Sequence, residues 1–124
     1  MAMLIPHLHF RGNCGQAIAL YEKAFDTKAK DIDRFDGGIN HASMKIHGQT
    51  VFLNDNEMLV REDNPFHFPV HLIIQFKTEK ELLACYEILR DGSEASPPFK
   101  KTSYSALVGN FADKFGMLWG FMVT

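Results

Sequence analysis

Histidines on two strand-like segments are the side chains of this chain best suited to chemistry. His7 and His9 stand two residues apart in LIPHLHF, so their imidazoles face the same side of a strand. In VHLIIQFK, His71 and Gln75 lie on the side opposite to the apolar residues. Imidazole binds metal ions and also donates or accepts hydrogen bonds near neutral pH. The pattern therefore predicts a polar strand face that binds a ligand or a metal ion.

The segment after the first two histidines predicts an amphipathic helix over residues 14–25. Its apolar residues recur on one helical face and are Ala17, Leu20, Tyr21, Ala24 and Phe25. Asn13 stands at the N-cap position, with Gln16 three residues further on. We expect Asn13 to cap this helix.

A second helix is expected after the second histidine segment. Thr78 and Glu81 form the T-x-x-E pattern of a capping box, and the helix is expected to run to Leu89. Asp91 and Gly92 follow as a stop signal. This is the most clearly marked helix start in the chain.

The order of the expected elements is β, α, β, β, β, and it occurs twice. Strands are expected at 4–10, 28–35, 40–46 and 49–54, and again at 70–77, 94–101, 105–111 and 117–123. The pair His7-Leu8 recurs as His71-Leu72, 64 residues later, and Tyr21 recurs as Tyr86. Any two amphipathic αβ segments can share a few letters, but the matching order of elements favours duplication.

The predicted fold class is α+β, with two βαβββ units that form curved mixed sheets. We expect one domain, composed of repeats at about 1–55 and 69–124 and a linker at 56–68, since the intervening stretch is charged and aperiodic. If each helix packs on the convex face of its sheet, the side chains of the concave face form the ligand pocket. The expected pocket residues are His7, His9, Phe52, Asn54, His71 and Gln75.

Composition and charge narrow the class of protein. The chain has 124 residues, 46% of them hydrophobic, and a net charge of −2, so no basic surface for nucleic acid or anionic membrane is evident. We expect no signal peptide and no membrane-spanning segment, because MAMLIPHLHF lacks a basic start and no apolar run reaches membrane-spanning length. Cys14 is either an activated thiol in the first turn of the helix or a buried inert one, and Cys85 is expected in the core. We expect a cytoplasmic protein.

Four segments carry a resemblance to a known family. They are HLHFRGNCGQAIALYEKAF at 7–25, NHASMKIHGQTVFLND at 40–55, HLIIQF at 71–76 and DKFGMLWGF at 113–121. The patterns G-N-C-x-x-A-I-x-x-Y and D-x-F-G-x-x-W are the specific ones. The chain resembles the PhnB-like branch of the vicinal-oxygen-chelate superfamily, which includes glyoxalase I, bleomycin-resistance proteins and extradiol dioxygenases.

The resemblance implies paired βαβββ units, a homodimer and, in metal-using members, ligands from the first and fourth strands of each unit. His7 (or His9) and His71 match the two first-strand positions. Gly120 stands where glyoxalase-type members place a glutamate, and the fourth strand of the first unit has Asn54 but no carboxylate. The resemblance thus implies at most an incomplete metal site at His7 and His71.

Three functions follow as hypotheses, and whether the protein is an enzyme stays open. The leading one is a PhnB-like protein that binds a small organic ligand in its cup without a complete metal site. The second is a metal-dependent lyase, isomerase or dioxygenase that uses His7 or His9 together with His71. The third is an antibiotic-sequestering protein of the bleomycin-resistance type.

Overall fold

The computed structural model describes residues 2–57, 70–92, 97–103 and 105–123. It divides into two compact units, Met1–Phe68 and Pro69–Thr124. The elements are β1 (His7–Phe10), α1 (Cys14–Phe25), β2 (Lys30–Phe35), β3 (Gly38–Ile46), β4 (Gln49–Asp55), β5 (Leu72–Phe76), α2 (Glu79–Leu89), β6 (Val108–Ala112) and β7 (Leu118–Val123). Most of the expected linker, from residue 58 on, lies outside the described residues.

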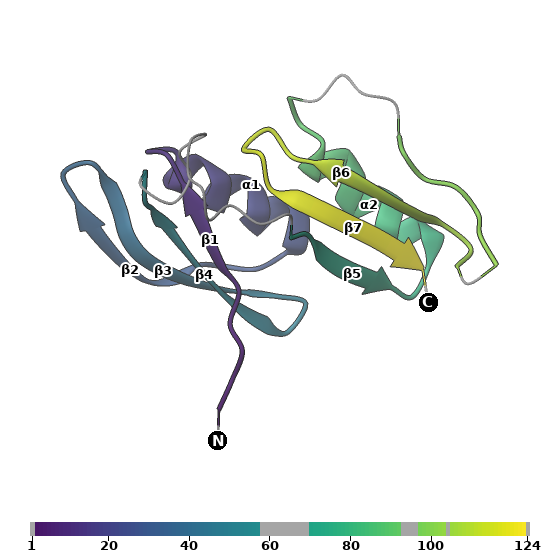
Figure 1. The fold of residues 1–124 in the computed structure, drawn as a ribbon, viewed down its shortest axis with the longest axis horizontal. Helices are drawn as coiled ribbons and strands as arrows, with labels where there is room; N and C mark the ends of the chain where they lie inside the picture. The colour runs from purple at the N-terminus through teal and green to yellow at the C-terminus, as the bar shows by residue number, and fades with distance from the viewer. Residues whose placement is uncertain (1, 58–69, 93–96, 104, 124) are drawn as a thin grey trace. The chain divides into compact units, whose positions relative to one another are not determined.

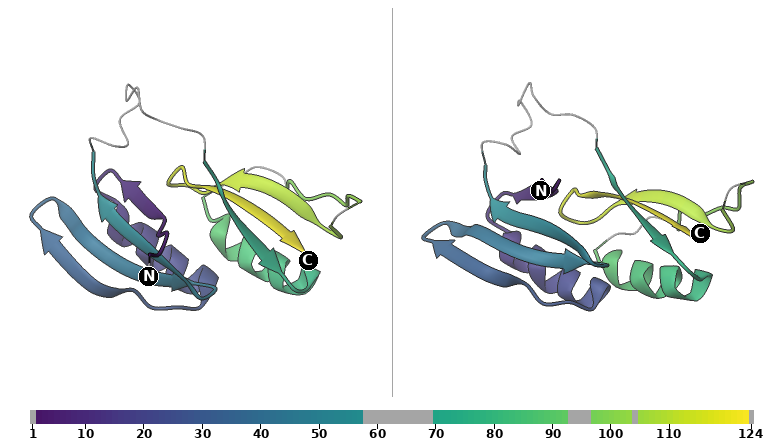
Figure 2. Two further views of the ribbon diagram at one scale, coloured as in Figure 1. Left: turned by 60° about the horizontal axis from the view of Figure 1, so that its bottom comes forward. Right: turned by 90° about the horizontal axis from the view of Figure 1, so that it is seen from below.

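The first unit is a four-stranded sheet with α1 along one side (Figures 1 and 2). The strand order is β1-β4-β3-β2, with β1 parallel to β4 and the other pairs antiparallel. Alternate residues of β1, β3 and β4 are buried and form the core with α1. This core includes Leu8, Phe10, Tyr21, Phe25, Met44, Val51 and Leu53. The other face of the sheet, opposite α1, carries the polar side chains.

The second unit repeats this topology, with α2 along one side of its sheet (Figure 2). The order is β5-β7-β6, with β5 parallel to β7 and β6 antiparallel to β7. Lys100 pairs with Val108 in an isolated antiparallel bridge, at the place that β2 takes beside β3. The predicted fold class, two βαβββ units, is confirmed.

The strand expected at 94–101 lies partly outside the described residues, which leave out 93–96. In 97–101 only Lys100 pairs with a strand. Pro97 and Pro98 explain why positions 97 and 98 do not pair, because proline has no N–H to donate to a ladder. The segment instead lies close over β6, where a Cβ at Gly109 would come within 2.9 Å of the Pro98 carbonyl oxygen.

The predicted cap of α1 is wrong. The Asn13 side chain makes no capping hydrogen bond; its Oδ1 accepts from the Arg11 backbone N–H at 3.2 Å. The backbone of Asn13 has φ −113° and ψ 19°, which differs from the extended conformation usual for an N-cap residue. The expected capping box with Gln16 therefore does not form.

The carboxylate of Asp55, at the end of β4, takes over this role. Its Oδ1 accepts from the backbone N–H groups of Gly12 at 2.8 Å and Cys14 at 3.0 Å, the latter being the first residue of α1. Its Oδ2 accepts from the backbone N–H of Ile39 in β3 at 2.9 Å. Because β4 runs parallel to β1, its last residue lies next to the loop that leads into α1. One side chain thus joins β4, β3 and the helix start.

Gly38, the first residue of β3, makes room for this carboxylate. Its φ is +145°, and a Cβ there would collide with Oδ2 of Asp55. We expect Gly38→Ala to lower the free energy of unfolding by about 2 kcal/mol or more, through backbone strain and loss of the Asp55 hydrogen bonds. Gly15→Ala, at a helical position with only the Ile39 side chain 3.9 Å away, should instead be neutral or stabilising by up to about 1 kcal/mol. Urea denaturation of both variants checks the contrast, and equal effects would contradict it.

The predicted N-cap of α2, Thr78, is confirmed. Thr78 Oγ1 accepts from the backbone N–H of Glu81 at 3.1 Å, and the backbone of Thr78 is extended. None of the described helices is long and apolar enough to cross a membrane.

Asp113 organises the turn before β7 in the second unit. Its Oδ1 accepts from the backbone N–H groups of Phe115 at 2.9 Å and Met117 at 3.0 Å. Its Oδ2 accepts from Trp119 Nε1 at 3.0 Å. Asp113 and Trp119 are both buried. The D-x-F-G-x-x-W pattern therefore stabilises this turn, because its Asp and Trp side chains are joined by a hydrogen bond and the Asp also bonds the turn backbone.

Candidate functional site

Five side chains gather on the face of the first sheet that is opposite α1. They come from three adjacent strands, and we call them the histidine face: His7 and His9 of β1, His41 of β3, and Phe52 and Asn54 of β4. The parallel register of β1 and β4 pairs His7 with Phe52 and His9 with Asn54. The set is exposed or half-buried, so a ligand can reach it.

The rings and the amide of the histidine face are in close contact. The ring centroids of His7 and His9 are 4.3 Å apart, and the rings of His7 and His41 approach Phe52 edge-on at 6.0 and 4.8 Å. His9 Nδ1 lies 2.6 Å from Asn54 Oδ1. The structure thus brings together four of the residues that the sequence proposed for the pocket. That they bind a ligand stays a prediction.

His41 belongs to this face and was missed by the sequence analysis. The alternation of β3 holds the signal, because Ala42 and Met44 are buried and His41 and Ser43 are the intervening positions. Counting this alternation outward from Met44 would have placed His41 on the sheet face opposite the core.

The surroundings of His7 favour its uncharged imidazole. The pKa of His7 lies below its ordinary value of 6.5, first because burial disfavours its charged form and then because His9 and His41 are nearby. His7 is therefore a neutral hydrogen-bonding group at pH 7 and not a fixed cation.

This shift predicts a pH dependence of stability. Because the folded state holds the His7 proton less tightly than the unfolded state, the free energy of unfolding should fall as pH decreases from about 7 through 6.5 toward the lowered pKa. Urea denaturation of the wild type and of His7→Gln between pH about 5.5 and 7.5 measures the effect. We expect a shallower pH slope in His7→Gln; the same slope in both proteins would contradict the assignment.

The remaining predicted pocket residues, His71 and Gln75, belong to the second unit. The alternation predicted for this strand is confirmed, because Ile74 is 7% exposed whereas Ile73 is 61% exposed. Gln75 Nε2 donates to the sulfur of Met122 at 3.7 Å. His71 and Gln75 are both exposed on the face of this sheet that is opposite α2.

Gly120 lies directly beside His71. A Cβ at Gly120 would come within 3.2 Å of His71 Nε2 and 3.0 Å of Asn110 Oδ1. A side chain at this position would therefore meet the His71 imidazole, as a metal-binding glutamate would need to. Position 120 is therefore placed so that a glutamate there would bind the same metal ion as His71, but glycine supplies no donor atom.

The donor atoms on the first sheet do not complete such a metal site either. The Asn54 amide oxygen is bonded to His9, and the Asp55 carboxylate is engaged by three backbone N–H groups. Within the described part of the chain, no three His, Cys, Asp or Glu side chains are grouped so that they could hold a metal ion. Imidazoles without an anionic ligand are a weak set for a divalent cation. The residues present do not fit the metal site of the glyoxalase type.

The two cysteines are inert. Burial raises the pKa of both Cys14 and Cys85 to about 12, and the nearby Asp55 carboxylate acts in the same direction on Cys14. A thiol with such a pKa carries almost no thiolate at neutral pH. Of the two alternatives for Cys14, the buried inert thiol is the one that fits, and Cys85 lies in the core as expected.

Paired βαβββ units, each with a helix on one sheet face and polar side chains on the other, define a fold of the glyoxalase type. The sequence profile of the Glyoxalase/Bleomycin resistance protein/Dioxygenase superfamily matches residues 4–121, so the chain belongs to this superfamily. The family resemblance seen in the sequence is thereby confirmed. A search among curated proteins gave no match.

Solved structures share the whole fold. A PhnB protein from Bacillus cereus, described as a putative 3-demethylubiquinone-9 3-methyltransferase, is 23% identical over 99% of this chain and 100% of that chain, with a TM-score of 0.82. A glyoxylase/bleomycin resistance protein/dioxygenase domain from Frankia sp. EAN1pec is 18% identical over 99% and 97%, with a TM-score of 0.72. The fosfomycin resistance protein FosX from Listeria monocytogenes is 11% identical over 100% and 93%, also at 0.72. These identities show the fold alone.

Proposed function

We propose that the protein binds a small organic ligand on its histidine face. The observation that carries the proposal is the clustering of three imidazoles, one amide and the Phe52 ring on one sheet face, where His7 and His41 contact the Phe52 ring, His9 contacts His7, and His9 bonds Asn54. An aromatic ring beside convergent polar groups is typical of a site that contacts an organic molecule and fixes its orientation. The lowered pKa of His7 leaves its imidazole neutral at pH 7, which fits a ligand held by hydrogen bonds more than by charge.

A fragment screen by ligand-observed NMR tests this proposal. We expect hits whose affinity falls about tenfold in His9→Phe, because a central hydrogen-bonding group is lost while the ring volume is kept. His47→Asn is the matched control, since His47 lies at the β3–β4 turn with φ 49°, which asparagine tolerates. Hits that bind equally well to His9→Phe would contradict the proposal.

A bleomycin-type compound in the screen tests the antibiotic-binding alternative.

A metal-dependent enzyme is the second candidate, and the exposed imidazole of His71 is the group that would bind the ion, since Gly120 beside it supplies no donor atom. A metal ion would then need ligands beyond the groups described above. Elemental analysis of protein purified without chelator is the test. A stoichiometric divalent ion that is lost in His71→Ala would establish this candidate in place of the first.

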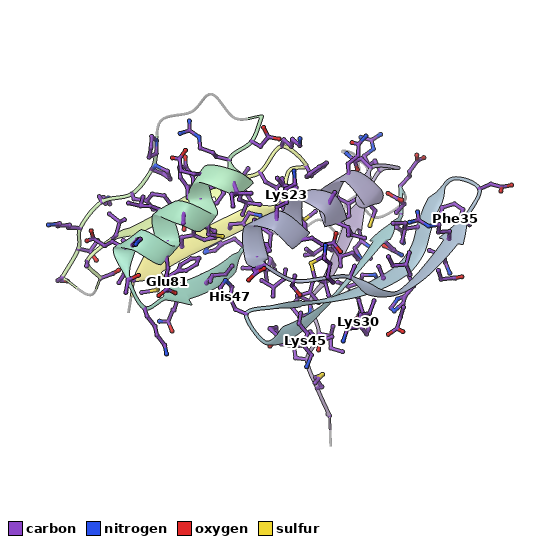
Figure 3. The ribbon with its side chains drawn as sticks, turned by 180° about the vertical axis from the view of Figure 1, so that it is seen from behind. Lys23, Lys30, Phe35, Lys45, His47 and Glu81 are labelled. Carbon is purple, nitrogen blue, oxygen red and sulfur yellow. The ribbon has the colours of Figure 1, made fainter. Side chains whose placement is uncertain are left out.

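We also propose that the protein is a cytoplasmic homodimer. Support for association comes from β2, an edge strand whose six residues are all exposed, with Ile32 42% and Phe35 51% exposed. Phe35 lies at the hairpin end of β2, far along the strand from Lys30 (Figure 3). An uncovered strand edge with apolar side chains favours contact with another chain. A monomeric mass at micromolar concentration would contradict the dimer.

A further inference from the structure

The contact between His9 and Asn54 determines which nitrogen of His9 carries the proton. Asn54 Oδ1 is an amide oxygen and can only accept, so His9 Nδ1, 2.6 Å away, must donate. A neutral imidazole has one N–H, and its other nitrogen then has a free lone pair. His9 Nε2 is therefore a hydrogen-bond acceptor whenever the ring is neutral.

The contact is built into the sheet. The parallel register pairs His9 with Asn54, and both side chains are half-buried, which protects their hydrogen bond from competing water. Phe52 precedes Asn54 by two residues on the same strand and thus lies on the same face. The acceptor nitrogen of His9 and an aromatic surface therefore belong to one patch.

We infer that Asn54 is a positioning residue that holds His9 in the Nδ1–H tautomer, and that the ligand of the histidine face is a protic compound whose O–H or N–H donates to His9 Nε2. The inference rests on the proposed function and narrows its ligand class. A flat protic compound such as a phenol or an enol combines the required donor with a surface that packs against Phe52.

The tautomer is measured in the free protein by long-range ¹H–¹⁵N NMR of the histidine rings, at a pH where the rings are neutral. In the wild type we expect a protonated Nδ1 and an unprotonated Nε2 on His9. Asn54→Leu should shift His9 toward protonated Nε2, whereas Asn54→Asp, which keeps an accepting oxygen, should retain the wild-type tautomer. Asn40→Leu, on an exposed residue of β3 that donates to Asp33, is the matched control.

Two results of this experiment would overturn the inference. One is a protonated Nε2 in the wild type, which would mean that the side-chain amide of Asn54 is rotated by about 180°, so that its NH2 group donates to His9 Nδ1. The other is an Asn54→Leu variant whose His9 tautomer is unchanged. Either result would leave the proposed ligand binding intact, because that is tested by the fragment screen.

Phenol and anisole, which differ in one O–H, test the ligand class. We expect phenol to bind about fivefold more tightly than anisole to the wild type and to Asn54→Asp, the value of one neutral hydrogen bond. Asn54→Leu should lose most of this preference. Equal affinities for the wild type, or no phenol binding by a protein with the expected His9 tautomer, would overturn the protic class.

Discussion

Replacing Asp55 by alanine is expected to lower the free energy of unfolding by about 3 kcal/mol or more. Three backbone N–H groups, from Gly12, Cys14 and Ile39, lose a charged acceptor at once. A hydrogen bond to a charged group contributes about 1.5–3 kcal/mol, and the three bonds share one carboxylate, so the effects do not simply add. The start of α1 and the first residues of β3 would lose their common anchor.

Chemical denaturation followed by circular dichroism measures this loss. Asn13→Ala is the informative control, because Asn13 is the residue that local sequence rules designate as the cap. Since its side chain accepts only the exposed Arg11 N–H, we expect a cost of about 0.5 kcal/mol or less. Asp55→Asn should be intermediate, as an amide offers one accepting oxygen. A larger cost for Asn13→Ala than for Asp55→Ala would show that the assignment of the cap is wrong.

Asp113→Ala is expected to cost about 3 kcal/mol, through the turn before β7. Asp113 is only 5% exposed, and its loss leaves the Trp119 indole N–H and two backbone N–H groups without this acceptor. Buried donors without partners cost about 1–3 kcal/mol each, less where the structure relaxes or water enters. The fluorescence of Trp119, the single tryptophan, reports the transition directly.

Asp91→Ala is the matched control for Asp113. The Asp91 carboxylate forms an ion pair with Lys114 Nζ at 3.0 Å, and both side chains are exposed to solvent. Lys114 directly follows Asp113 in the chain, so the control lies close to the same turn. A surface ion pair contributes about 1 kcal/mol or less. Equal losses of stability in Asp91→Ala and Asp113→Ala would contradict the role assigned to the buried Asp113–Trp119 contact.

Local signals account for the parts of the fold that the sequence predicted. The apolar stripe of α1 and the Thr78 N-cap of α2 depend on residues within one or two helical turns, so both can be read from the sequence. Alternation placed His7 and His9 on one strand face and Ile74 in the core. The doubled order of elements then led to the paired topology.

The missed features depend on contacts between distant residues. Asp55 caps a helix that begins 41 residues earlier in the chain, and no local pattern indicates this. The partnership of His9 and Asn54, 45 residues apart, requires the exact parallel register of β1 and β4. His41 is different, because the alternation in β3 would have located it. The sequence could therefore predict which side chains share a face, but not which atoms meet.

Mapping a fragment hit onto the protein by amide chemical-shift perturbation is the most direct test of the central claim. With phenol as the ligand, we expect the largest shifts in β1, β3 and β4, at residues near His7, His9, His41, Phe52 and Asn54. Titration of His9→Phe should need about tenfold more phenol to reach the same perturbations, whereas His47→Asn should behave as the wild type does. Shifts confined to α1 or to the second unit, with the histidine face unperturbed, would contradict the account.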